Sequence, residues 1–175
     1  NFGSVSKVIP TKLIEKEERL LRTYTKSKSS PLQKLSSLFG FMDEIYSHVQ
    51  QLTPCKKGCN SCCHYNINIS ELEASLITQV TNRKALKAHK PTIKTDFHGS
   101  PCPFLSDGAC SIYEVRPFVC RRYVSLSDTS KWCNTVVAND YEFPILNFTE
   151  VDKSYNYILS QSQLHTVQDI RQFFK

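Results

Sequence analysis

A stretch of ten residues, 55–64, carries an unusual density of thiols. It contains four cysteines followed by a histidine: Cys55, Cys59, Cys62, Cys63 and His64. A packed core has no use for four thiols at this density, whereas thiolates are ligands of zinc and of iron–sulfur clusters. Because Cys62 and Cys63 are neighbours, we expect their side chains to diverge and to serve different centres.

A second set of cysteines lies further along the chain, with 7, 9 and 12 residues between successive members: Cys102, Cys110, Cys120 and Cys133. These gaps suit loops that converge on the first run. All eight cysteines are predicted metal ligands, with Cys55 and Cys133 completing the count. They are enough for two four-ligand sites, or for one polynuclear cluster plus a mononuclear site. His64 is expected to be exposed, or to hydrogen-bond a thiolate, rather than to bind the metal.

Further motifs surround the second set of cysteines: Cys102-Pro103-Phe104-Leu105, Gly108-Ala109-Cys110-Ser111-Ile112-Tyr113 and Arg116-Pro117-Phe118-Val119-Cys120-Arg121. In this order, residues 55–133 resemble the bacterial CxxCxxCC family of zinc- or iron-chelating proteins, also called the YkgJ-type cysteine cluster family. The named motif has two residues between its first two cysteines, whereas Lys56, Lys57 and Gly58 make three here. The resemblance implies metal binding. Through a relative with a similar cysteine cluster, the flagellin lysine N-methylase, it also implies a link to methyl transfer.

Eight cysteines in 175 residues have a second interpretation, a disulfide framework in an oxidising compartment. The adjacent Cys62 and Cys63 favour ligand loops over the dispersed cysteine pairs of a stapled secreted domain. Thiolate ligands belong to a reducing compartment, so we expect a cytoplasmic location. Zinc is the metal expected in aerobically purified protein because it is redox-inert, and an iron–sulfur cluster is the alternative.

Three arginines lie close to Cys120: Arg116, Arg121 and Arg122. A cluster with net negative charge is stabilised by nearby guanidinium groups, which can donate to several sulfur or carbonyl acceptors at once. The alternative is that the three arginines form ordinary surface ion pairs.

The N-terminal part of the chain, residues 1–54, is expected to be helical apart from a flexible lead-in over residues 1–10. An amphipathic pattern predicts a helix over residues 11–24. Ser30 and Pro31 predict the start of a longer helix, because serine caps a helix and proline suits its first turn. Apolar residues then recur every three or four positions as far as Leu52, and Thr53-Pro54 ends the helix just before Cys55.

The middle part, residues 55–133, is expected to be a loop-rich metal-binding core. The pattern predicts a short extended segment over residues 65–69 and a helix after a capping box at Ser70. A turn at residues 106–108 should set Cys102 and Cys110 across a reversal. Pro117 should open a short helix, and a final helical region is expected within residues 134–175, with a break near Ser160. The sequence therefore predicts a single, mainly α domain of residues 1–175 with little or no β-sheet.

Composition excludes several classes of protein. Hydrophobic residues make up 40% and charged residues 22% of the chain, and the formal charge of +6 counts thiols as neutral. No apolar run approaches the ~20 residues that a membrane span needs. Lysines and arginines are scattered among carboxylates, so the sequence predicts no nucleic-acid-binding face.

No catalytic residue and no cofactor loop can be named, since the chain lacks a phosphate-binding loop, a G-x-G-x-x-G and a G-x-S-x-G. Our first hypothesis is a cytoplasmic metal-binding protein of undetermined cellular role, whose predicted partners are metal ions. The alternatives are an iron–sulfur enzyme or enzyme component, linked to protein lysine methylation by the resemblance, and a secreted disulfide-stapled domain. The sequence identifies no protein partner.

Overall fold

The computed structural model describes residues 2–87, 96–137 and 144–175. Within them, helices dominate: α1 Phe2–Val8, α2 Thr11–Glu18, α3 Leu20–Lys26, α4 Pro31–Ser47, α5 Glu71–Thr81, α6 Phe118–Arg122, α7 Thr149–Ser160 and α8 Ile170–Phe173. Short 3₁₀ helices add η1 Gln50–Leu52, η2 Ser61–His64, η3 Tyr113–Val115 and η4 Ser130–Cys133. Strands in these described ranges form two two-stranded sheets, β1 Asn68–Ser70 with β4 Val167–Asp169, and β2 Leu105–Ser106 with β3 Ala109–Cys110. The predicted mainly α fold class is confirmed.

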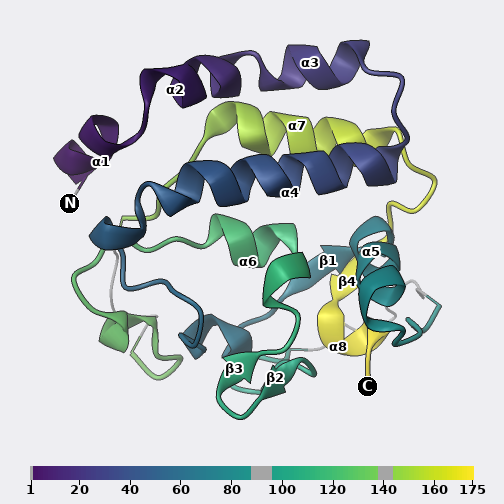
Figure 1. Cartoon of the computed structure of the whole chain (residues 1–175). Coiled ribbons are helices and arrows are strands. Elements are labelled where there is room, and N and C mark those ends of the chain that lie inside the picture. Colours follow the sequence, from purple (N-terminus) through teal and green to yellow (C-terminus); the bar gives the residue numbers. More distant parts are fainter. Residues whose placement is uncertain (1, 88–95, 138–143) are drawn as a thin grey trace.

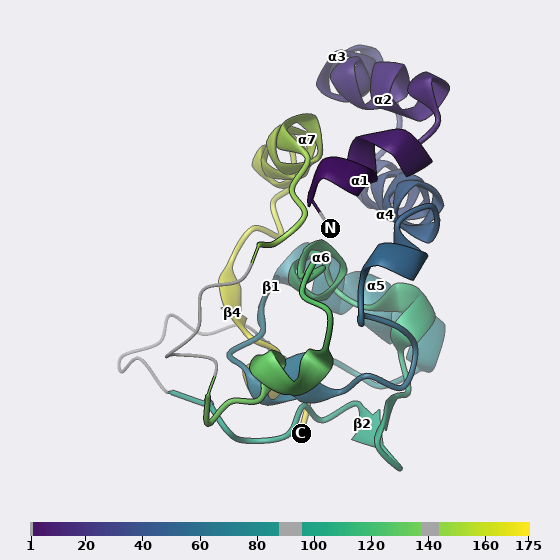
Figure 2. The same cartoon turned by 90° about the vertical axis from the view of Figure 1, so that its left-hand side faces the viewer.

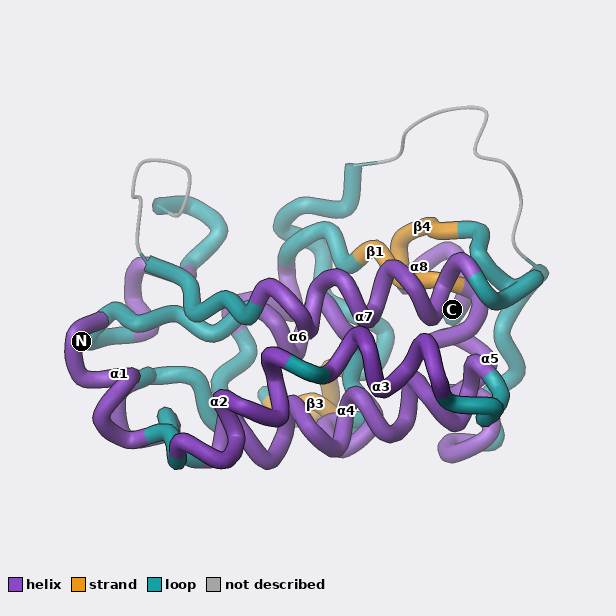
Figure 3. The backbone as a smooth tube through the Cα atoms, turned by 90° about the horizontal axis from the view of Figure 1, so that it is seen from above, coloured by secondary structure: helices purple, strands orange, loops and turns teal. Residues whose placement is uncertain are grey.

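The helices are stacked above the cysteine-bearing loops. Figure 1 shows α2 and α3 on top, α4 and α7 in the next layer, and α6 beneath them. Helix α3 packs on α7, α7 packs on α4, and α4 packs on α6. Figure 2 shows the same layers end-on, with the loops at the base. From above, α3, α4 and α7 run alongside one another (Figure 3). The helical layers therefore form a roof over the loops.

Helix α4 is the longest helix of the described chain and begins where the sequence predicts. The side chain of Ser30 accepts a hydrogen bond from the backbone N–H of Gln33, Gln33 bonds back to the N–H of Ser30, and Pro31 fills the first turn. Its face of Leu35, Leu38, Met42 and Ile45 is completely buried. The helix ends at Ser47, earlier than the predicted Leu52, and η1 carries the chain on toward Cys55.

The N-terminal segment departs from the sequence prediction in two respects. Residues 2–8 form helix α1 rather than a flexible lead-in, and Val5 packs against the helical core. The predicted helix over residues 11–24 is divided into α2 and α3, which meet at Arg19. Both differences depend on packing against distant helices, which local periodicity does not record.

Buried apolar side chains form two clusters. The larger one lies among the helices and includes Leu35, Met42 and Ile158. The smaller one lies under them, where Ile69 and Phe173 pack together with four cysteines: Cys63, Cys102, Cys110 and Cys120. Half of the cysteines are thus part of the second core.

The C-terminal segment returns to the cysteine-bearing region. The sequence predicts a final helical region with a break near Ser160, and α7 does end at Ser160. Beyond the break, however, β4 precedes α8 and pairs with β1 in antiparallel register, Ile69 opposite Gln168. Asp169 then caps α8 by accepting a hydrogen bond from the N–H of Arg171. The strand forms because β1, which is distant in the sequence, offers it a hydrogen-bonding edge.

No helix in the described ranges has the length and apolar character that crossing a membrane requires.

A buried carboxylate, Glu73, joins three helices. One oxygen accepts hydrogen bonds from the N–H and hydroxyl of Ser70, both at 2.8 Å, and from the hydroxyl of Tyr155 at 2.6 Å. The other oxygen accepts from the N–H of Phe118 at 2.7 Å, at the start of α6. Glu73 is only 1% exposed, so α5, α6 and α7 depend on one side chain for buried hydrogen bonds. This contact helps to place Cys120, which lies on α6.

Replacing Glu73 with alanine should lower the free energy of unfolding by about 3 kcal/mol. The N–H of Phe118 and the hydroxyl of Tyr155 would lose a buried acceptor, and each unsatisfied group costs roughly 1–3 kcal/mol. Urea denaturation measures the change. Gln33→Ala, which removes the matching residue of the exposed capping box on α4, should cost about 1 kcal/mol or less. Equal losses in the two variants would contradict a special role for Glu73.

Candidate metal centre

The eight predicted ligands come from six segments of the chain. Cys55 and Cys59 lie in the loop after η1, Cys62 and Cys63 lie on η2, and the later cysteines lie before β2, at the end of β3, on α6 and at the end of η4: Cys102, Cys110, Cys120 and Cys133. All eight fall within the described residues, and none is joined in a disulfide. Cys102 and Cys133 are buried and the others are half-buried.

The first cysteine group consists of Cys63, Cys102, Cys110 and Cys120. The N–H of Cys102 donates a 2.8 Å hydrogen bond to the carbonyl of Cys63, which ties the two cysteine runs together. All four side chains pack in the smaller apolar cluster. Burial raises the pKa of the Cys120 thiol, and the charges of the other three thiolates add to this rise. Mutual electrostatic effects of this kind require that the four groups lie close together.

The turn that presents Cys110 is the one that the sequence predicts. Asp107 and Gly108 both have positive φ, 49° and 74°, as a two-residue hairpin turn between antiparallel strands requires. Cys110 pairs with Leu105 across this hairpin, rather than with Cys102. Cys102 lies just before the hairpin, where its carbonyl accepts a 3.0 Å hydrogen bond from the N–H of Leu105.

The second cysteine group consists of Cys55, Cys59 and Cys133. Burial, followed by the charges of Cys55 and Cys59, raises the pKa of the Cys133 thiol to about 11. The carbonyl of Cys133 accepts a 2.6 Å hydrogen bond from the hydroxyl of Tyr65, which follows η2. The sulfur of Cys55 accepts a hydrogen bond from the N–H of Ser125 at 3.4 Å. This group therefore lies between η2, η4 and the loop after α6.

Cys62 and Cys63 connect the two groups. The interaction of these neighbouring thiols lowers the pKa of Cys63 to about 7 and raises that of Cys62. The expectation that their side chains serve different centres stays a prediction. The charges of both Cys59 and Cys120 also act on Cys62, so that it adjoins both groups.

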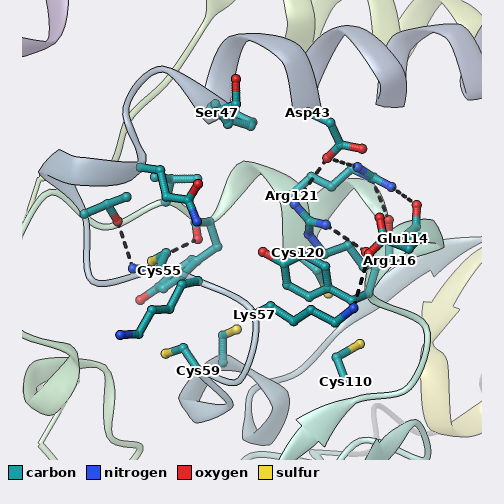
Figure 4. Close-up of a pocket in the computed structure, with 18 of the residues that line it drawn as sticks. Asp43, Ser47, Cys55, Lys57, Cys59, Cys110, Glu114, Arg116, Cys120 and Arg121 are labelled. Carbon is teal, nitrogen blue, oxygen red and sulfur yellow. Dashed lines mark hydrogen bonds and ion pairs between the residues drawn. The ribbon is translucent and has the colours of Figure 1, made fainter. Parts of the chain in front are cut away.

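A cavity of about 350 Å³ separates α4 from the cysteines. Six cysteines line it: Cys55, Cys59, Cys62, Cys63, Cys110 and Cys120. Figure 4 shows Asp43 and Ser47 on the helical wall, with Cys59 and Cys110 on the opposite wall. Cysteines of both groups therefore line a shared space, which Cys102 and Cys133 do not border.

The donor set suits zinc or iron, because soft thiolates select these metals. Within the described ranges, however, no three cysteine, histidine or acidic side chains form a ready-made metal cage. Cysteine side chains have a single rotatable bond to sulfur, so small rotations within each group would have to close the coordination shell. The thiol side chains therefore suit zinc or iron chemically, and the positions of the sulfur atoms in a complete coordination shell depend on metal binding.

The three arginines near Cys120 form ion pairs. Arg121 is 1% exposed and pairs with Asp43, which also accepts a 3.3 Å contact from Arg116. Arg122 forms two hydrogen bonds to Asp152, at 2.7 and 3.0 Å. Other N–H groups of Arg116 and Arg121 donate to backbone carbonyls. All three arginines therefore form ion pairs, but the pair of Arg121 is buried rather than on the surface. Their predicted role in offsetting the charge of a bound cluster stays a prediction.

A different arginine, Arg171, contacts the cysteine-bearing backbone and was not singled out from the sequence. Its guanidinium donates a 3.1 Å hydrogen bond to the carbonyl of Cys63. Arg171 lies far beyond Cys133 in a segment with an ordinary helical pattern, so the sequence alone offers no signal for it.

His64, at the end of η2, has no contact in the structure that makes it a ligand candidate, and its exclusion from the ligand set stays a prediction.

Comparison with known proteins adds one finding. Residues 54–141 match the model of the CxxCxxCC family, which is described as "Putative zinc- or iron-chelating domain". Neither a curated protein nor a solved structure matches the chain. The family match covers half of the chain and contains all eight cysteines, including the six that line the cavity. The chain belongs to the CxxCxxCC family.

Proposed function

We propose that this protein binds zinc or an iron–sulfur cluster through its eight cysteines. The observation that carries the proposal is the convergence of thiols from six separate segments on one region beside a cavity. Thiolates are costly to bury together unless a metal neutralises their charges, and burial together with neighbouring thiolates raises the pKa of Cys120 and Cys133. Membership of a metal-chelating family supports the same conclusion.

The grouping of the cysteines supports two adjacent centres. Cys63, Cys102, Cys110 and Cys120 supply four thiolates, which complete a tetrahedral site. Cys55, Cys59 and Cys133 supply three more, and Cys62 is the nearest candidate for the fourth position. Eight thiolates then hold two ions. A single polynuclear cluster is the competing arrangement, and the electrostatic effect of both Cys59 and Cys120 on Cys62 is the feature that favours it.

Zinc is the metal that we expect in protein purified in air, because all-thiolate sites bind it tightly and it is redox-inert. An iron–sulfur cluster is the alternative in the cell, where oxygen-sensitive centres survive. All eight thiols are free of disulfides in the structure, which suits a reducing compartment, and we place the protein in the cytoplasm. Because contacts to the cysteine segments come from both α4 and the C-terminal segment, we treat residues 1–175 as one domain.

A second candidate function is catalytic, and the cavity is the observation that favours it. Structural zinc sites are closed by four protein ligands, whereas catalytic sites keep a position open. A volume of about 350 Å³ lies within the range of small-molecule sites. The link to lysine methylation rests on the family resemblance alone.

Metal analysis and an absorption spectrum of protein isolated without oxygen separate the candidates. Brown protein with matching amounts of iron and sulfide favours redox chemistry, and colourless protein with two zinc ions per chain favours a structural centre.

The two-centre arrangement predicts that Cys110→Ser and Cys133→Ser each remove about half of the bound metal, since each belongs to one group only. The double variant should remove nearly all of it. Metal per chain, measured by mass spectrometry on purified protein, provides the readout. Ser111→Ala is the matched control, because its hydroxyl only donates to the carbonyl of Phe104, and it should retain the full metal content. Complete loss in either single variant would instead indicate one polynuclear cluster.

Metal removal should unfold the cysteine-bearing region before the helices. Coordination of a structural zinc supplies roughly 10 kcal/mol or more, comparable with the whole stability of a domain of this size. After treatment with chelator and reductant, amides of residues 55–87 and 96–133 should exchange rapidly. Amides of α4 and α7 should remain protected, because the larger apolar cluster contains no cysteine. Unchanged exchange in residues 55–133 would show that the metal is not structural.

A further inference from the structure

Arg171 is held in a complete set of hydrogen bonds. A guanidinium has five N–H groups, and each one here has an acceptor. Nε donates to the carbonyl of Pro101 at 3.1 Å. Nη1 donates to the carbonyl of Tyr65 at 3.2 Å and to the carboxylate of Asp169 at 3.0 Å. Nη2 donates to the carbonyls of Cys63, at 3.1 Å, and Ser100.

The four carbonyl acceptors come from the segments of both cysteine runs. Cys63 and Tyr65 belong to η2 and the residue after it, whereas Ser100 and Pro101 directly precede Cys102. The carbonyl of Cys63 also accepts from the N–H of Cys102. One side chain therefore links the two backbone segments that present two of the four thiols in the first group.

The arginine is itself fixed in position. Asp169 is 4% exposed and pairs with it, while also accepting a 2.7 Å hydrogen bond from the N–H of Ile67. The side chain of Arg171 is only 9% exposed, and its guanidinium also lies over the ring of Phe97. The pairing of β4 with β1 brings both residues to this place. Burying a charge is costly unless it is paired and hydrogen-bonded, and here every donor is used.

We propose that Arg171, anchored by Asp169, is a positioning residue that sets Cys63 against Cys102 and thereby fixes the geometry of the first cysteine group. This inference rests on the proposed metal-binding function. Both residues lie outside residues 54–141, the part that matches the family. We call Arg171 and Asp169 together the C-terminal clamp. In this proposal the clamp completes the metal centre from outside the family motif. Lysine cannot replace the arginine fully, because an ammonium has three donors and no planar fork.

The test measures zinc affinity for each group separately in the full-length protein. Cys133→Ser disrupts the second group and leaves the first intact, whereas Cys110→Ser disrupts the first group and leaves the second intact. Competition with a chromophoric chelator gives the zinc affinity in each background. Adding Arg171→Gln should weaken zinc binding about 10- to 100-fold in the Cys133→Ser background, the usual effect of losing a residue that orients metal ligands. The Cys110→Ser background should change about 2-fold or less, and Arg171→Lys should give an intermediate loss in the first group.

Arg122→Gln is the matched control, because Arg122 also forms a two-bond pair with a carboxylate but donates to no cysteine carbonyl in the described structure. It should leave both zinc affinities unchanged. Circular dichroism checks folding, and if Arg171→Gln loses its helical signal, Arg171→Lys decides the result. Equal weakening of both groups, or no weakening of the first, would overturn the clamp. Absence of zinc binding in both parent backgrounds would instead overturn the proposed function on which the clamp rests.

Discussion

The carbonyl of Cys63 is the point on which the cysteine-bearing region depends. It accepts hydrogen bonds from the N–H of Cys102 and from the side chain of Arg171, so that segments from three parts of the chain meet at one oxygen atom. A carbonyl has two lone pairs and can serve both donors. Backbone hydrogen bonds fix positions more tightly than thiol packing does, because thiols are weak donors and acceptors. The relative placement of the two cysteine runs is therefore set largely by polar contacts of the main chain.

Contacts from the helices fix the position of Cys120. Glu73 accepts a hydrogen bond from the first turn of α6, and Arg121 is buried against Asp43 of α4. Cys120 lies between these two contacts on the short helix α6, which is too short to be stable alone. The helical layers thus do more than cover the loops, since they hold Cys120, the one of the eight cysteines that lies on an α-helix.

The two cysteine groups experience different surroundings. The first group packs among apolar side chains such as Ile69 and Phe104, where burial opposes thiolate formation. The second group is bordered by polar groups, including the hydroxyl of Tyr65 and the N–H of Ser125. Thiolates in an apolar shell gain most from a neutralising cation, because charge interactions are strongest where the dielectric constant is low. Under the proposed function, the first group would therefore depend more strongly on bound metal than the second.

By itself, the sequence determined the cysteine-rich set of candidate metal donors, the capped starts of α4 and α5, the hairpin turn at Asp107 and Gly108, and the mainly α class. These features are local, because residue type and short spacing fix caps, turns and ligand chemistry. Only the tertiary structure decided which cysteines share a group, that Cys110 pairs with Leu105 rather than with Cys102, and that residues 167–169 form a strand. It also decided that Arg171, rather than the arginines beside Cys120, holds the cysteine backbone. Each of these depends on contacts between residues far apart in the chain, and periodicity and spacing carry no record of them.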